Sequence, residues 1–154
     1  MVLAGALLAG TAGCTFISQQ ATLIRYDPSD GIGATIGGLD VRNMIALIND
    51  DGHAVSLLVT IVNNDSSGQM LNLQYSSAGQ KTSISKYVNG NSTASFGNAV
   101  GEKQIIILNP DTKAGALYPV YLQAGDDPGQ QVLVPVLPAD LPQYKELAPP
   151  AILK

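Results

Sequence analysis

The sequence predicts an all-β domain, an immunoglobulin-like antiparallel β-sandwich of seven or eight strands. A length of 154 residues suits one domain with a proper hydrophobic core. Apolar residues alternate with polar ones over short segments, and turn-forming Gly, Pro, Asn and Asp recur about every ten residues, as they do between short strands. Each sheet needs a second apolar face to bury its own, so we expect two packed sheets.

The first third of the chain holds the weakest strand signals. Residues 17–26 are expected to contain an edge segment, and residues 27–31 a turn rich in Pro, Asp and Gly. Glycines recur at positions 31, 33, 37 and 38, but a phosphate-cradling loop also needs a following helix and a Lys-Ser or Lys-Thr pair. We therefore interpret this stretch as a flexible connection.

The next segment, Leu39–Ile48, fits two patterns. Leu39, Val41, Ile45 and Leu47 alternate as in a strand, although a helical stripe is also possible. Strand-like neighbours favour a strand. Further strands are expected at residues 55–61, 71–75, 81–88, 93–96, 104–108, 118–122 and 132–136.

Three connections carry specific expectations. Asn89-Gly90 is a strong signal for a hairpin turn. The continuous apolar run 104–108 suits a central strand, and strands 118–122 and 132–136 should pair across the turn at 126–129. Pro119 and Pro135 cannot donate a ladder hydrogen bond, so each should lie at an edge, a bulge or a strand end.

Composition divides the chain into four parts. We expect a signal peptide at residues 1–13, a lipidated tether at 14–20, the β-sandwich at 21–138 and a Pro-rich extended tail at 139–154. No run of about 18 apolar residues occurs, so membrane contact must come through an anchor.

The anchor is predicted from the leader and the lone cysteine. Residues 2–12 are small, apolar and uncharged, a length typical of a signal-peptide core. The segment ending in Thr11, Ala12, Gly13 and Cys14 resembles a bacterial lipobox, which implies a diacylglyceryl group on Cys14. A thioether needs a sulfur nucleophile, and Cys14 is the only cysteine. Two acyl chains would anchor the protein stably. The alternative is that Cys14 is an ordinary small residue in a buried N-terminal segment.

The inventory of reactive side chains predicts no enzyme. The sole imidazole, His53, follows a turn and is expected at the surface, without a nucleophile to activate. One His and one lipidated Cys do not complete a zinc or copper set. The acidic pairs at 50–51 and 126–127 suit solvated turns better than calcium sites. Eight basic residues, spread thinly, give no footprint for nucleic acid.

Four segments carry a resemblance to a known family. They are LDVRN at 39–43, LLVTIVN at 57–63, GALYPV at 115–120 and VLVPVL at 132–137. In these segments the chain resembles actinobacterial LpqE-like envelope lipoproteins, which are distantly related to the periplasmic copper chaperones called PCu(A)C. The resemblance implies an accessory subunit on the outer face of the cytoplasmic membrane, for example of the respiratory supercomplex.

The copper ligands of the chaperones do not carry over. Those proteins bind Cu(I) through two Met and two His, including a His-x-Met pair, because soft thioethers suit that ion. No His-x-Met occurs here, and His53, Met44 and Met70 are too few and wrongly spaced. We therefore expect a non-enzymatic, lipid-anchored interaction domain without a metal or other cofactor, which binds another envelope protein through an edge, a loop face or its tail. The alternative is a degenerate metal or small-ligand carrier.

Overall fold

The computed structural model describes residues 29–147 and Pro149. The described residues form nine strands and one short 3-10 helix, and no helix among them is long and apolar enough to cross a membrane. The all-β sandwich predicted from the sequence is confirmed. The elements are β1 (Ile32–Ile36), β2 (Leu39–Ile48), β3 (Ala54–Asn63), β4 (Gln69–Ser77), β5 (Gln80–Val88), β6 (Ser92–Phe96), β7 (Ile105–Leu108), β8 (Leu117–Ala124), β9 (Gln130–Pro138) and η2 (Lys145–Leu147).

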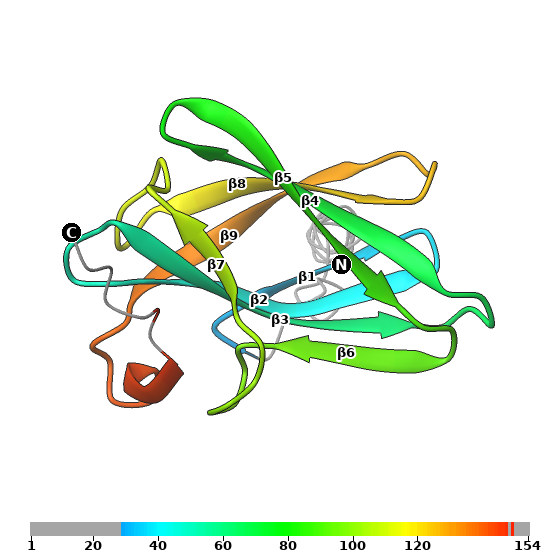
Figure 1. The fold of residues 1–154 in the computed structure, drawn as a ribbon, viewed down its shortest axis with the longest axis horizontal. Coiled ribbons are helices and arrows are strands. Elements are labelled where there is room, and N and C mark those ends of the chain that lie inside the picture. The colour runs from blue at the N-terminus through cyan, green and yellow to red at the C-terminus, as the bar shows by residue number, and fades with distance from the viewer. Residues whose placement is uncertain (1–28, 148, 150–154) are drawn as a thin grey trace, which may run out of the picture.

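The strands form two layers that share β9. Sheet A contains β1, β2, β3, β6 and β7, and sheet B contains β5, β4, β8 and β9 in that order. Residues 130–135 of β9 pair antiparallel with β8, whereas residues 136–138 pair parallel with β2. In Figure 1, β9 accordingly lies beside β8 along one part and approaches β2 at its end. The parallel pair is the one departure from the antiparallel pairing expected.

The prolines lie where ladder hydrogen bonding changes. β8 pairs with β4 only from Tyr121 to Ala124, so Pro119 lies in the part of β8 that precedes this pairing. Pro135 is the last β9 residue that pairs with β8, directly before the chain turns to β2. Both therefore occupy strand edges or ends, as expected from their missing N–H groups.

The core lies between the two sheets. In β8 buried and exposed side chains alternate, with Tyr118, Val120 and Leu122 fully buried. They pack with Leu71 and Leu73 of β4 in one cluster that also includes buried residues of sheet A. Each such side chain contributes about 1.5–3 kcal/mol by leaving water. The Tyr118 hydroxyl donates to the Ser76 carbonyl, and burial, more than the nearby Tyr75 and Asp111, raises the pKa of Tyr118.

The glycine-rich stretch is not a flexible connection, contrary to the prediction. It forms β1, which pairs antiparallel with β2 across a turn at Gly37 and Gly38. Gly37 has a φ of 57°, and a Cβ on Gly38 would lie 1.9 Å from the Asp65 carboxylate. Gly37 is therefore favoured by the left-handed backbone of a tight turn, whereas a side chain at position 38 would have to displace the Asp65 carboxylate.

Two further connections differ from the prediction. Asn89-Gly90 does not close a hairpin, because β5 pairs with β4 and β6 pairs with β3, so the turn passes between the sheets. A Cβ on Gly90 would lie 2.0 Å from the Ser66 carbonyl oxygen, which explains the glycine by close loop packing. The apolar strand β7 is not central, since it pairs only with β3.

The tail is not extended over its described residues. The Ala139 N–H donates to the Ile48 carbonyl at 3.0 Å, and turns then lead into η2. Tyr144 and Leu147 pack on a second apolar cluster on the outer side of sheet A, formed by Ile45, Leu47 and Leu58 with Ala139. The Pro content predicted an extended segment, but burial of these side chains folds the tail back onto the sheet (Figure 1). The predicted segment at 17–26 lies outside the described residues.

Candidate functional site

The structure separates the residues that the sequence singled out. Cys14 and the lipobox positions Thr11, Ala12 and Gly13 lie outside the described residues. His53 is exposed, as expected, and its backbone N–H donates to the Asp51 carboxylate at 2.9 Å. Asp50-Asp51 and Asp126-Asp127 lie in connections between strands.

Met44, Met70 and His53 do not form one site. Met44 is 1% exposed within the core, whereas Met70 is 40% exposed. His53 precedes β3 and Met70 follows its far end, and a ten-residue strand spans about 30 Å. In the part of the chain that the structure describes, no three His, Cys, Asp or Glu side chains gather in a way that could hold a metal ion.

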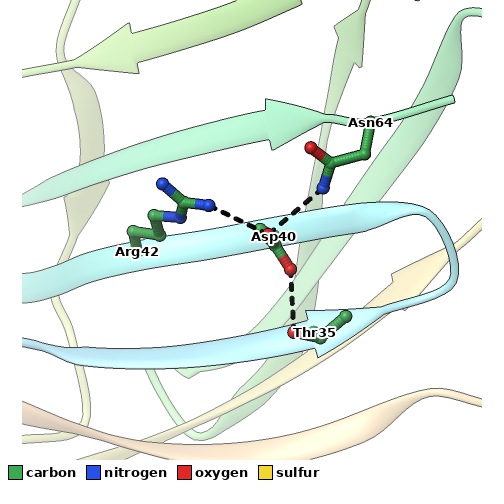
Figure 2. A network of polar contacts seen from close by, with 4 residues as sticks. All are labelled: Thr35, Asp40, Arg42 and Asn64. Carbon is green, nitrogen blue, oxygen red and sulfur yellow. Dashed lines mark hydrogen bonds and ion pairs between the residues drawn. The ribbon is translucent and has the colours of Figure 1, made fainter. Parts of the chain in front are cut away.

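A polar network surrounds Asp40 on sheet A (Figure 2). The Asp40 carboxylate accepts hydrogen bonds from the Thr35 hydroxyl at 2.8 Å, from Arg42 at 3.0 Å and from the Asn64 amide at 3.1 Å. The Thr35 hydrogen bond, followed by those of Arg42 and Asn64, lowers the pKa of Asp40. Because the carboxylate is already satisfied by donors from β1, from β2 and from Asn64, the residue that follows β3, the network ties these segments together and offers no free reactive group.

The outer face of sheet B gathers most of the exposed apolar surface. Side chains directly opposite each other on paired strands share a face, so the register defines which residues belong to it. The described residues expose seven large apolar side chains, and five of them are on this face: Met70, Tyr87, Leu117, Tyr121 and Leu133. We call this surface the sheet B face; it consists of Met70, Asn72, Gln74, Ser76, Lys81, Ser83, Ser85, Tyr87, Leu117, Pro119, Tyr121, Gln123, Gln131, Leu133 and Pro135.

The centre of the sheet B face is apolar and ordered by cross-strand pairs. Leu117 lies opposite Pro135, and Pro119 lies opposite Leu133. Tyr121 lies opposite Gln131, and its ring packs on Gly129, where an added Cβ would lie 2.4 Å from the ring. The glycine of the β8–β9 connection therefore leaves room for the aromatic ring.

A hollow of about 340 Å³ adjoins Tyr121 on the sheet B face. The side chains of Gln74, Lys81, Tyr121 and Gln131 line it, and they form no hydrogen bond or ion pair with any residue that the structure describes. Amide groups donate and accept, so two such groups leave both kinds of partner position open. The hollow can therefore receive a polar or an amphipathic group beside the aromatic ring.

Charge is nearly absent from the sheet B face. Lys81 is the one Lys, Arg, Asp or Glu among its residues, although the chain has 8 basic and 12 acidic residues. Removing ions from water is costly, so a face without them can be covered with little desolvation penalty. Depletion of charge, together with exposed Tyr and Met, is typical of the centre of protein interfaces.

The sheet B face was not predicted from the sequence. A sequence signal for this face is present in β8 and β9. Leu117 and Leu133 occupy positions where the alternating pattern would place polar residues. Apolar residues on both sides of a strand indicate that both sides are covered. Here the second side stays open in the described structure, with Leu117 58% and Leu133 46% exposed.

Comparison with known proteins identifies structures with a similar fold. No family model matches the chain, and no curated protein matches it by sequence. Among solved structures, the apo PCuAC domain of PmoF2 matches with a TM-score of 0.56 and 13% identity, over 71% of this chain and 97% of that one. The chain has the fold of a PCuAC domain.

Two further PCuAC domains agree with this match. The apo domain from PmoF1 aligns with a TM-score of 0.51 and 13% identity, over 68% of this chain and 98% of that one. The copper-bound domain from PmoF2 aligns with a TM-score of 0.50 and 12% identity, over 70% of this chain and 98% of that one. These likenesses agree with the distant relation to copper chaperones expected from the sequence, and at such identity they establish the fold alone.

Proposed function

We propose that this protein is a non-enzymatic interaction module, anchored through lipid on Cys14 to the outer face of the cytoplasmic membrane, whose sheet B face binds a protein partner. The observation that carries the proposal is the face itself. Leu117, Tyr121 and Leu133 are 40–58% exposed on a nearly uncharged sheet, and no described residue covers them. Exposed apolar patches of this kind mark interaction surfaces.

The anchor in this proposal comes from the sequence. A small apolar leader ending at the only cysteine supports lipidation of Cys14, and the resemblance to LpqE-like lipoproteins supports a respiratory supercomplex as the assembly joined. Labelling with a palmitate analogue tests the anchor in wild type and in Cys14→Ala. We expect label in the wild type only, and equal labelling of both would refute lipidation.

The binding role is tested by charge substitution on the exposed face. The tagged full chain would be extracted in mild detergent as wild type, Leu133→Glu and Leu108→Glu. Leu108 is a matched control because it is 52% exposed but belongs to β7 of sheet A. We expect a stoichiometric protein partner that is retained by wild type and Leu108→Glu and lost by Leu133→Glu. A partner is either another protein or an untagged second copy of this chain that is co-expressed with the tagged one. Retention of that partner by all three variants, or capture of neither kind of partner, would contradict the proposal.

A second candidate function is a copper-related carrier, favoured by the fold shared with the PCuAC domains. The positions of Met44, Met70 and His53 disfavour it, since Met44 is buried in the core, Met70 is exposed on sheet B, and β3 separates His53 from Met70. Anaerobic titration with Cu(I) discriminates the two functions. Tight stoichiometric binding supports the carrier, and its absence leaves the interaction module.

A further inference from the structure

We propose that the partner of the sheet B face is a second copy of this chain, bound face to face about a two-fold axis. This inference rests on the proposed function, because it names the occupant of the same surface. It is carried by the charge, the area and the side-chain chemistry of that surface.

Charge favours self-pairing through this face. In a two-fold interface the same patch lies on both copies, so a patch with a strong charge of one sign repels itself. The chain carries a net charge of -4, yet the sheet B face contains no acidic side chain and only Lys81 as a base. Lys81 lies near the start of β5, which is an edge strand. Two copies can therefore bring this face together without placing their acidic groups in contact.

The area of the face fits a weak dimer. Four strands about 4.8 Å apart and up to nine residues long, with a rise of about 3.3 Å per residue, cover roughly 550 Å² in projection. Two copies would bury roughly 1,100 Å², near the lower limit for a specific interface. Anchoring both copies in one membrane raises their effective concentration, so a contact that is weak in solution becomes populated there.

The side chains beside Tyr121 suit a symmetric contact. The side-chain amides of Gln74 and Gln131 have no hydrogen-bond partner among residues 29–147, so an amide on one copy can pair with an amide on the other. Tyr121 packs beside Gly129 and is 40% exposed, and it supplies an aromatic surface of the kind enriched among the residues that dominate binding energy. The apolar centre of the face is completed by two cross-strand pairs, Leu117 with Pro135 and Pro119 with Leu133.

Cysteine cross-linking tests the dimer in the membrane. The chain has one native cysteine, so Leu133→Cys, Tyr121→Cys and the control Leu108→Cys each add a single defined thiol. The full-length variants would be treated in membranes with a short bismaleimide and compared on denaturing gels. We expect a band of twice the monomer mass for Leu133→Cys and Tyr121→Cys but not for Leu108→Cys. Monomers at both sheet B positions, or an equal yield from Leu108→Cys, would overturn the proposal.

Sedimentation equilibrium gives an independent test on the full chain carrying Cys14→Ser. We expect reversible dimers whose Kd rises at least tenfold with Leu133→Glu and is unchanged with Leu108→Glu, while circular dichroism shows that both variants stay folded. A monomer at every concentration would overturn the inference. If the chain is monomeric and Leu133→Glu still abolishes capture of a different protein, this inference fails and the proposed function stands; if Leu133→Glu changes neither readout, both fail.

Discussion

The outer faces of the two sheets carry similar apolar side chains but have opposite exposure. On sheet A, Ile45, Leu47 and Leu58 are at most 2% exposed, because Tyr144 and Leu147 from the C-terminal segment pack against them. On sheet B, Leu117 and Leu133 have no such cover among the described residues.

Strand β9 contributes to both outer faces. Leu137, which lies on the sheet A side, packs under the C-terminal segment, whereas Leu133, four residues earlier, is 46% exposed. The local sequence of the strand does not distinguish the two positions. The comparison teaches that coverage by a distant segment, rather than composition, makes one face part of the fold and leaves the other available for binding.

The largest expected effect comes from placing a charge on each face in turn. Leu58→Asp would bury an unpaired carboxylate beneath the C-terminal segment and should lower the free energy of unfolding by about 3–5 kcal/mol, or prevent folding. Leu133→Asp should change it by less than about 0.5 kcal/mol, because that side chain is solvated. Urea denaturation measures both, and equal losses would show that the two faces do not differ as described.

A smaller loss of stability is expected from removing the side chains that cover the outer face of sheet A. Tyr144→Ala combined with Leu147→Ala deletes the side chains that pack on Ile45, Leu47 and Leu58. The double variant should lose about 2–4 kcal/mol of stability through lost apolar burial. It should also bind more of a hydrophobic dye such as ANS, since a second apolar face is opened. Leu117→Ala combined with Leu133→Ala is the matched control, and a comparable loss of stability in it would contradict the comparison.

Deprotonation of Tyr144 at alkaline pH should weaken the packing of the C-terminal segment on the outer face of sheet A. Burial and the hydrogen bond to Asp30 raise the pKa of Tyr144 to about 12 from an ordinary value of 10. A raised pKa in the folded state means that the contribution of Tyr144 is fully present below pH 10 and is lost as the pH rises through about 12. The difference in stability between wild type and Tyr144→Phe, measured by urea denaturation, should therefore shrink over this range. A difference that is independent of pH would contradict the role of the phenol.

The smallest effect is expected at the Asp40 network. Asp40→Asn should cost less than about 1 kcal/mol near neutral pH, because the ion pair with Arg42 lies at the surface, where the Asp40 side chain is 25% and the Arg42 side chain 60% exposed. The hydrogen-bond donors lower the pKa of Asp40 below its ordinary value of 3.8. Its contribution is therefore present above pH 3.8 and is lost as the pH falls through the lower folded value. Thermal unfolding of both proteins at neutral and acidic pH should show the difference narrowing in acid.

Sequence by itself determined the strands of strong local alternation. The alternation of Tyr118, Val120 and Leu122 and of Val132, Val134 and Val136 predicted β8, β9 and the hairpin between them, because a period of two depends only on neighbouring residues. The turn residues at 126–129 agreed with the same hairpin. The small apolar leader and Cys14 remain a prediction from sequence, since both lie outside the described residues.

Only the tertiary structure decided which surfaces stay open. The pairing of β1 with β2, the passage of residues 89–90 between the sheets and the parallel pair of β2 with β9 all join segments whose own patterns are weak or ambiguous. The cover over Leu47 comes from Tyr144 and Leu147, about a hundred residues away in the chain. The physical reason is that burial depends on which distant segment packs against a strand, and the alternation within a strand carries no information about that segment.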